Sequence, residues 1–152
     1  MHNPVRTCPN SGAPMQRGVR PMTLEYKSLR ITVDMPGWYC DTCEEAILDG
    51  EDMKVSDRAL NRLKARADDL PLPEKIKSVR LKLHLTQEAA GELIGGGPRA
   101  FQKYEAGDLL PSRAIGSALA LLDRDPQGLS VLRARPETRP FGHATGGFDD
   151  AD

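Results

Sequence analysis

Apolar and polar residues alternate along two segments near the N-terminus of the chain. Residues 23–26 and 30–35 both show this period of two, which is typical of strands with one buried face. Lys27 and Ser28 lie between the segments, and we expect them to form the turn of a strand pair. Pro36 and Gly37 follow the second segment and are expected to end that strand, because a proline cannot donate to a strand ladder.

The period then changes from that of a strand to that of a helix. From residue 51 to about residue 67, apolar residues recur at helical spacing, at positions 53, 60, 63 and 67. Four basic residues lie mostly on other faces of this predicted helix: Arg58, Arg62, Lys64 and Arg66. The simpler interpretation of this basic stripe is a solvated face.

Two more helices are predicted on either side of the glycine run 95–97. Thr86 is of a residue type that caps a helix N-terminus, and Pro98 suits the first position of the second helix, where its missing N–H is no loss. Gly107 stands where a helix ends in a left-handed residue. Gly91 lies inside the first helix at a cost on the order of 1 kcal/mol against alanine, so we expect another helix to cross close to its backbone.

Two short helices at this spacing form a helix-turn-helix, a motif whose second helix enters the major groove of DNA. The inner face of that second helix is predicted to carry Ala100, Phe101 and Tyr104. The outer face carries three side chains that can reach base edges or phosphates: Arg99, Gln102 and Lys103. The alternative is an ordinary helical hairpin in a packed core, with these three side chains merely solvated.

The net charge of −1 argues against DNA binding until it is divided along the chain. Residues 1–73 carry ten basic and eleven acidic side chains, whereas residues 74–135 carry ten basic and seven acidic ones. The segment with the predicted helix-turn-helix therefore has a charge of +3, which is the sign required for contact with phosphates.

Composition and turn-forming residues predict a small α+β protein of two domains. The apolar fraction is 39% and the aromatic fraction 5%, which allows small cores only. Two prolines and an acidic pair between positions 68 and 73 disfavour a continuous helix there. The predicted parts are a zinc-finger-like β domain with a helix (1–68), a linker (69–73), an all-α helix-turn-helix domain (74–135) and a disordered tail (136–152).

The chain carries no signal for a membrane or for secretion. No apolar run approaches the roughly 18 residues that cross a bilayer, and the first residues form no secretory segment. The three cysteines are an odd number, which favours reduced thiols or a metal site over disulfides. We therefore expect a cytoplasmic protein.

Residues 75–123 resemble the Xre-type helix-turn-helix, and the pattern GGGxxAFxxYExG at 95–107 is similar to the MqsA subgroup of type II toxin–antitoxin antitoxins. The segment GWYCDTCEE at 37–45 resembles the second half of the YgiT-type zinc finger of the same antitoxins, and CPNS at 8–11 takes the place of its first half. The resemblance covers residues 6–133, with the two modules in the family's order.

The resemblance implies a DNA-binding repressor that neutralises a partner toxin, an mRNA-cleaving ribonuclease, through its N-terminal domain. The C-terminal domain is then expected to form a homodimer and to bind a palindromic operator on double-stranded DNA. By the Xre pattern, Gln87 would hold a phosphate. The two base-reading positions, usually asparagine and arginine in the family, are Arg99 and Lys103 here, so we expect a different operator sequence. The alternative is a stand-alone Xre-family regulator, which the absence of a neighbouring toxin gene would indicate.

The family's zinc site has four cysteine ligands in two knuckles. Cys40 and Cys43 form an intact second knuckle, but the first has only Cys8, because Ser11 stands where the fourth cysteine belongs. A serine hydroxyl is a poor zinc ligand. Three outcomes remain open: His2 or another nearby group completes the site, a water fills it, or the metal is lost and packing holds the domain.

Enzyme chemistry has little support in the sequence. The CDTC segment at 40–43 could be a redox motif, but Glu44 and Glu45 follow it and are expected to raise the thiol pKa, and no thioredoxin-like pattern surrounds it. No His-Glu pair indicates a catalytic zinc. The three histidines accompany no nucleophile at a recognisable spacing: His2, His84 and His143. His84 is expected at a helix end, as a cap or surface residue.

Overall fold

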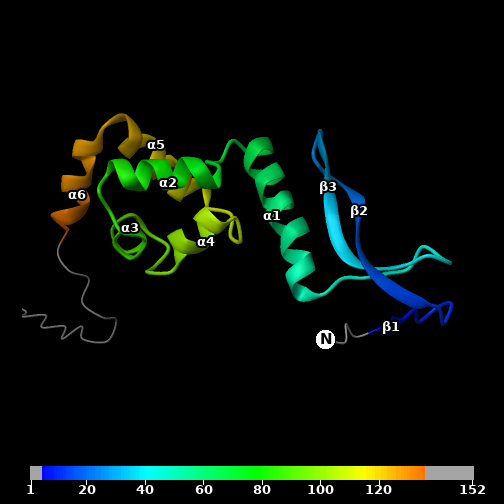
Figure 1. Cartoon of the computed structure of the whole chain (residues 1–152). Coiled ribbons are helices and arrows are strands. Elements are labelled where there is room, and N and C mark those ends of the chain that lie inside the picture. The colour runs from blue at the N-terminus through cyan, green and yellow to red at the C-terminus, as the bar shows by residue number, and fades with distance from the viewer. Residues whose placement is uncertain (1–4, 136–152) are drawn as a thin grey trace, which may run out of the picture.

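The computed structural model describes residues 5–135, so His2, His143 and the predicted tail at 136–152 lie outside the described part. Figure 1 shows an antiparallel sheet on one side, a group of helices on the other, and the long helix α1 (Gly50–Ala67) between them. We call residues 5–67 the sheet unit and residues 73–135 the helical unit. The predicted α+β class is confirmed.

The sheet is built around one long antiparallel ribbon. Its four strands lie in the order β1 (Arg6–Thr7), β2 (Pro14–Tyr26), β3 (Leu29–Cys40) and β4 (Ala46–Ile47). Lys27 and Ser28 form the turn between β2 and β3, as expected. The register places Met15 opposite Cys40, so the cysteine end of β3 lies beside the start of β2.

The prediction that Pro36 and Gly37 end the second strand is wrong. β3 continues to Cys40, with Pro36 opposite Val19 and Gly37 opposite Gly18 of β2. β4 pairs only with Trp38 and Tyr39 of β3, so β3 has one neighbouring strand at Pro36. An open strand edge is the place in a sheet that tolerates a residue without an N–H donor.

Helix α1 packs against β2 and β3 (Figure 1). Arg17 of β2 fixes its first turn, donating from both Nη atoms to the two carboxylate oxygens of Asp52, at 2.8 Å each. The second Asp52 oxygen also accepts from the backbone N–H of Asp49, at 2.9 Å. Asp52 is buried, so this arrangement provides partners for a carboxylate that could not be buried alone.

The helical unit has its own hydrophobic core. It comprises α2 (Pro73–Lys82), α3 (Gln87–Ile94), α4 (Ala100–Ala106), α5 (Arg113–Arg124), a short 3-10 turn (Pro126–Gly128) and α6 (Leu129–Arg133). Phe101 and Ile76 are fully buried in this core, and Leu119 of α5 closes it from the other side. His84 is an exposed residue with φ 57° just after α2, so its predicted place at a helix end is confirmed.

The segment 68–72 between the units is not helical, as Pro71 predicts, and Pro73 is the first residue of α2. It packs against α5 rather than crossing open solvent. A Cβ built on Gly116 of α5 would lie 3.1 Å from Cδ of Pro71 and 3.6 Å from Cδ2 of Leu70. Among the described residues, we find no helix with the length and apolar character needed to span a bilayer.

Candidate DNA interface and candidate metal centre

The turn between α3 and α4 is closed by a contact between two glycines. The N–H of Gly97 donates to the carbonyl of Gly91 at 3.2 Å. A Cβ on Gly91 would lie only 1.8 Å from the carbonyl oxygen of Gly97, so no side chain fits there. We predicted a crossing helix at Gly91; the close backbone is instead that of the following turn. Thr86 caps α3 as expected, accepting from the N–H of Ala89 at 3.1 Å.

Helix α4 begins at Ala100, two residues after the proline that was expected to open it. Pro98 and Arg99 instead complete a turn, in which the N–H of Ala100 donates to the carbonyl of Gly97 at 3.3 Å. The helix ends at Gly107, which has φ 83° and is left-handed as predicted. The structure therefore has two short helices, α3 and α4, joined by a tight glycine turn.

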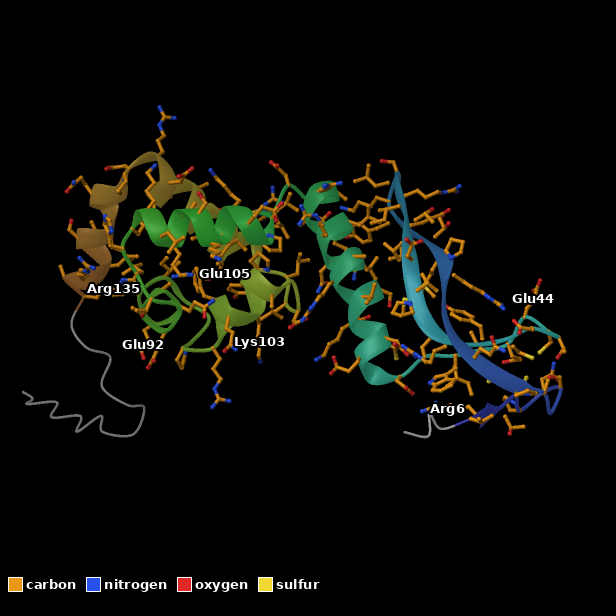
Figure 2. The ribbon with its side chains drawn as sticks, in the orientation of Figure 1. Arg6, Glu44, Glu92, Lys103, Glu105 and Arg135 are labelled. Carbon is orange, nitrogen blue, oxygen red and sulfur yellow. The ribbon has the colours of Figure 1, made fainter. Side chains whose placement is uncertain are left out.

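The two faces of α4 are divided as the sequence predicts. Ala100, Phe101 and Tyr104 are buried, and the two aromatic rings meet edge to face with centroids 5.5 Å apart. Arg99, Gln102 and Lys103 are all exposed. Figure 2 shows Lys103 on the outer side of α4. Within residues 5–135, neither Arg99 nor Lys103 forms an ion pair, so both charges are available to a ligand.

A largely buried ion pair that sequence analysis missed holds α4 against α2. Arg80 of α2 donates from Nε and Nη2 to the Glu105 carboxylate at 2.9 and 2.8 Å. The two side chains are only 11% and 6% exposed. Arg80 also donates from Nη1 to the carbonyl of Leu85 at 3.0 Å, before α3. Glu105 lies on the side of α4 that faces α2 (Figure 2), so the pair fixes the orientation of α4 and its outer face.

Gln87 lies at the opposite end of the motif, as the first residue of α3. Its side chain is partly buried, beside the exposed N-terminus of that helix. Backbone N–H groups at such a terminus favour an anion, which is compatible with the phosphate contact expected for Gln87.

Cys8 is distant in sequence from Cys40 and Cys43, but the three cysteines gather at one end of the sheet. The sulfur atoms of Cys8, Cys40 and Cys43 all lie within 4.8 Å of one another, and those of Cys8 and Cys43 are 3.5 Å apart. Cys8 follows β1, Cys40 ends β3, and Cys43 lies in the loop before β4, close to Glu44 (Figure 2). Three convergent sulfurs could bind a metal ion and are typical of a thiolate site.

Ser11 completes this group. Its Oγ lies 3.3 Å from Sγ of Cys40, and its backbone N–H donates to Sγ of Cys8 at 3.4 Å. Thr42 donates from Oγ1 to Ser11 Oγ at 3.0 Å and lies 3.1 Å from Sγ of Cys40. The donor set is therefore three sulfurs and one hydroxyl oxygen, and the residues present fit a metal that accepts thiolates.

The surroundings of the three thiols lower the pKa of Cys8 and Cys40 and raise that of Cys43. The side chains of Ser11 and then Thr42 lower the pKa of Cys40 to about 6. The Ser11 side chain is also the largest influence lowering the pKa of Cys8. Glu44 and Glu45 were expected to raise the thiol pKa by their charge, but at Cys40 the hydroxyl groups determine the direction. For Cys43, the Glu45 N–H lowers the pKa, but burial and the neighbouring thiols prevail and raise it.

The arrangement does not match a redox motif. A CxxC redox pair places its reactive thiol at a helix N-terminus. Here Cys40 is the last residue of a strand and Cys43 lies in the loop between two strands.

A third group of contacts joins the two units through α1. Arg58 donates to Asp108 from Nε at 2.7 Å, and Asn61 donates from Nδ2 to the carbonyl of Gly107 at 3.0 Å. Arg62 donates from Nη1 to Glu74 of α2 at 2.8 Å. The predicted solvated stripe therefore contributes two of its four basic residues to contacts with the helical unit. No periodicity within α1 could have indicated these partners.

The chain is similar to known antitoxins over most of its length. The family model described as the antitoxin component of bacterial toxin-antitoxin system, MqsA, matches residues 6–133. Antitoxin MqsA of Escherichia coli (strain K12) is 41% identical over 101 residues, which are 64% of this chain and 75% of that protein. The match to the family model spans both units and the segment between them.

Proposed function

Since this chain belongs to the MqsA family of antitoxins, we propose that its helical unit binds operator DNA as a repressor and its sheet unit binds the partner toxin. The observation that carries the DNA proposal is the outer face of α4. Gln102 and Lys103 on α4 and Arg99 in the turn just before it are exposed together on the second half of a helix-turn-helix, next to a largely buried ion pair that fixes the orientation of α4. The role is that of a regulator and not of an enzyme.

The chemistry of these side chains defines what they read. Arg99 and Lys103 donate to O6 and N7 of guanine in the major groove, whereas Gln102 can pair with adenine. Gln87 holds a phosphate at the N-terminus of α3 and positions the helices without reading sequence. Other family members have asparagine and arginine at the two reading positions. Because this chain has Arg99 and Lys103 there, its operator sequence should differ from theirs.

A homodimer through the helical unit would bind a palindromic operator, because two-fold symmetry of the protein matches two half-sites. Two large apolar side chains near the end of this unit support a contact between copies. Leu121 of α5 is 72% exposed, and Val131 of α6 is 69% exposed.

The toxin is proposed to be an mRNA-cleaving ribonuclease, as the family resemblance implies, and the protein is proposed to act in the cytoplasm. A small toxin-like reading frame next to this gene would support the pair. If the purified product of that frame does not bind the full chain, the remaining interpretation is a stand-alone regulator.

We propose zinc as the metal held by Cys8, Cys40 and Cys43. A structural zinc would join the loop after β1 to the end of β3 and the loop before β4, a region otherwise covered by few apolar side chains. Its contribution is to cross-link these loops, since structural zinc supplies folding free energy to small domains.

A gel-shift titration with the DNA upstream of the gene tests the DNA proposal. Arg99→Ala should weaken binding by about 1–3 kcal/mol and relax selection at one base pair. Gln87→Ala should weaken binding to all sequences alike. Lys75→Ala is a matched control, because it removes one exposed charge that pairs with Asp123 away from α4. Wild-type affinity in the double variant Arg99→Ala, Lys103→Ala would refute the assignment of α4.

A further inference from the structure

We propose that the hydroxyl oxygen of Ser11 is the fourth ligand of the metal, so that this chain has a closed site of three cysteines and one serine. The inference rests on the proposed zinc and does not depend on DNA or toxin binding.

Ser11 lies at the tip of a tight loop after Cys8. The loop returns through hydrogen bonds from the N–H of Gly12 to the carbonyl of Cys8 (2.9 Å) and from the N–H of Cys8 to the carbonyl of Ala13 (2.8 Å). Inside this loop, the Ser11 N–H donates to Sγ of Cys8 at 3.4 Å. Cys8 and Ser11 have the same spacing as Cys40 and Cys43, so Ser11 occupies the second ligand position of a knuckle.

The Ser11 oxygen lies close to the other knuckle. It lies 3.3 Å from Sγ of Cys40, which belongs to the other knuckle. A tetrahedral zinc has oxygen ligands at about 2.0–2.2 Å and sulfur ligands at about 2.3 Å, so neighbouring ligand atoms come within a few ångströms of one another. The Ser11 oxygen therefore lies at the separation from a thiolate that a shared ion requires.

Two donors hold the Ser11 oxygen in place. Thr42 Oγ1 donates to it at 3.0 Å, and the N–H of Ala13 donates to it at 3.3 Å. A free serine side chain would lose rotamer freedom on binding a metal, and these contacts restrict that freedom beforehand. Partners of this kind orient metal ligands in known sites, where their loss weakens metal affinity. Because both lone pairs of the neutral hydroxyl accept from these donors, Ser11 binds the metal as an alkoxide, and its hydroxyl proton passes to solvent.

The competing ligand is water, and burial shows where it would enter. Cys8 and Cys40 are each 1% exposed, whereas Ser11 and Thr42 are exposed residues. The fourth position therefore lies on the solvent side of the cluster. A serine ligand closes that side, but a water ligand leaves it exchangeable.

This difference gives a test in the full chain loaded with Co²⁺, whose absorption reports the ligand set. Imidazole is titrated into the wild type and into Ser11→Ala. We expect imidazole to change the spectrum of Ser11→Ala, where water fills the position, and to leave the wild type unchanged. Ser11→Cys is the matched closed control and should gain intensity in the thiolate-to-metal bands. A wild-type spectrum that responds to imidazole as Ser11→Ala does would overturn the proposal.

Thr42 provides a second test that leaves all ligands in place. Thr42→Val removes the donor to Ser11 and should lower zinc affinity by about 10–100-fold in competition with a chromophoric chelator. Thr42→Ser keeps the hydroxyl and should restore the affinity. Equal affinity in wild type and Thr42→Val would count against a positioned serine ligand. Wild-type protein without metal by elemental analysis would refute the zinc proposal itself, whatever the gel shift shows.

Discussion

Gly91 has no room for any side chain, and this leads to a prediction at the residue scale. Gly91→Ala places a methyl group where the Gly97 carbonyl oxygen lies, 1.8 Å away, so the turn before α4 must move. Overpacking of this kind costs about 1–3 kcal/mol, and we expect that loss in denaturant unfolding. Gly50→Ala is the control, because nothing lies within 4 Å of its added Cβ. Equal stability of the two variants would contradict the contact.

The buried carboxylate of Asp52 makes the stability of the protein depend on pH in the acid range. Hydrogen bonds from Arg17, and then from the Asp49 N–H, lower the pKa of Asp52 from 3.8 to about 2. A carboxyl group whose pKa is lower in the folded state stabilises that state fully at pH values above its unfolded pKa. This contribution to stability is lost as the pH falls toward the folded-state pKa. Between pH 3.8 and about 2, the melting temperature of the wild type should approach that of Asp52→Asn.

The neighbouring variant Glu51→Gln is the control for this titration, because the Glu51 side chain is exposed and its ion pair is with Lys54 only three residues away. Its melting temperature should run parallel to that of the wild type over the same pH range. A constant difference between wild type and Asp52→Asn would show that the carboxylate does not titrate as its contacts require.

Residue identities predicted the local features of the site but not its long-range partners. The exposure of Gln102 and Lys103 follows from helical periodicity alone, since a helix face needs no knowledge of the rest of the fold. Arg99 is exposed as well, but it lies in the turn before α4. Arg80 and Glu105 are 25 residues apart, and no repeat in the sequence links them. The cysteine cluster was predicted through family resemblance. The bond between Thr42 and Ser11 spans 31 residues and has no sequence signal.

At the scale of elements, the type of each segment was more predictable than its length. The alternating pattern marked only residues 23–26 of β2, which extends over Pro14–Tyr26. Gly18 and Pro21 interrupt the alternation in that strand, yet pairing with β3 continues past both. A ribbon with open edges accepts such residues, and only the three-dimensional arrangement shows which edges are open.

The segment 68–72 gives a prediction about fragments. Residues 74–135 are the helix-turn-helix domain predicted from the sequence. A fragment with these bounds keeps the core around Ile76 and Phe101, so it should fold. A fragment of residues 70–135 also keeps the contacts of Leu70 and Pro71 with Gly116, so it should melt at a higher temperature. Circular dichroism of both fragments checks the order. A 74–135 fragment without a cooperative transition would show that the helical unit needs residues before position 74, and the same result for the 70–135 fragment would show that it needs α1.

At the scale of the whole molecule, the two units meet through polar contacts. Exposed ion pairs of this kind contribute roughly 0–1 kcal/mol each, so they set orientation more than stability. The double variant Glu74→Gln, Asp108→Asn removes the partners of Arg62 and Arg58. We expect faster proteolysis at residues 68–72 and a broader size distribution in small-angle X-ray scattering, with little change in melting temperature.

Asp123→Asn is the matched control, because Asp123 pairs with Lys75 and Lys82 inside the helical unit. It should leave proteolysis at residues 68–72 unchanged. If both variants are cleaved at the same rate, the ion pairs of α1 do not hold the units together.

The place where α1 meets the helical unit has a thermodynamic consequence. Asn61 donates a hydrogen bond to the carbonyl of Gly107, the residue that caps the C-terminus of α4. A ligand of the sheet that shifts α1 at this contact therefore changes the free energy of α4's last turn. Binding linkage is reciprocal, so DNA on α4 would alter the affinity of that sheet ligand by the same factor. The coupling free energy between the two sites can thus be measured from either one.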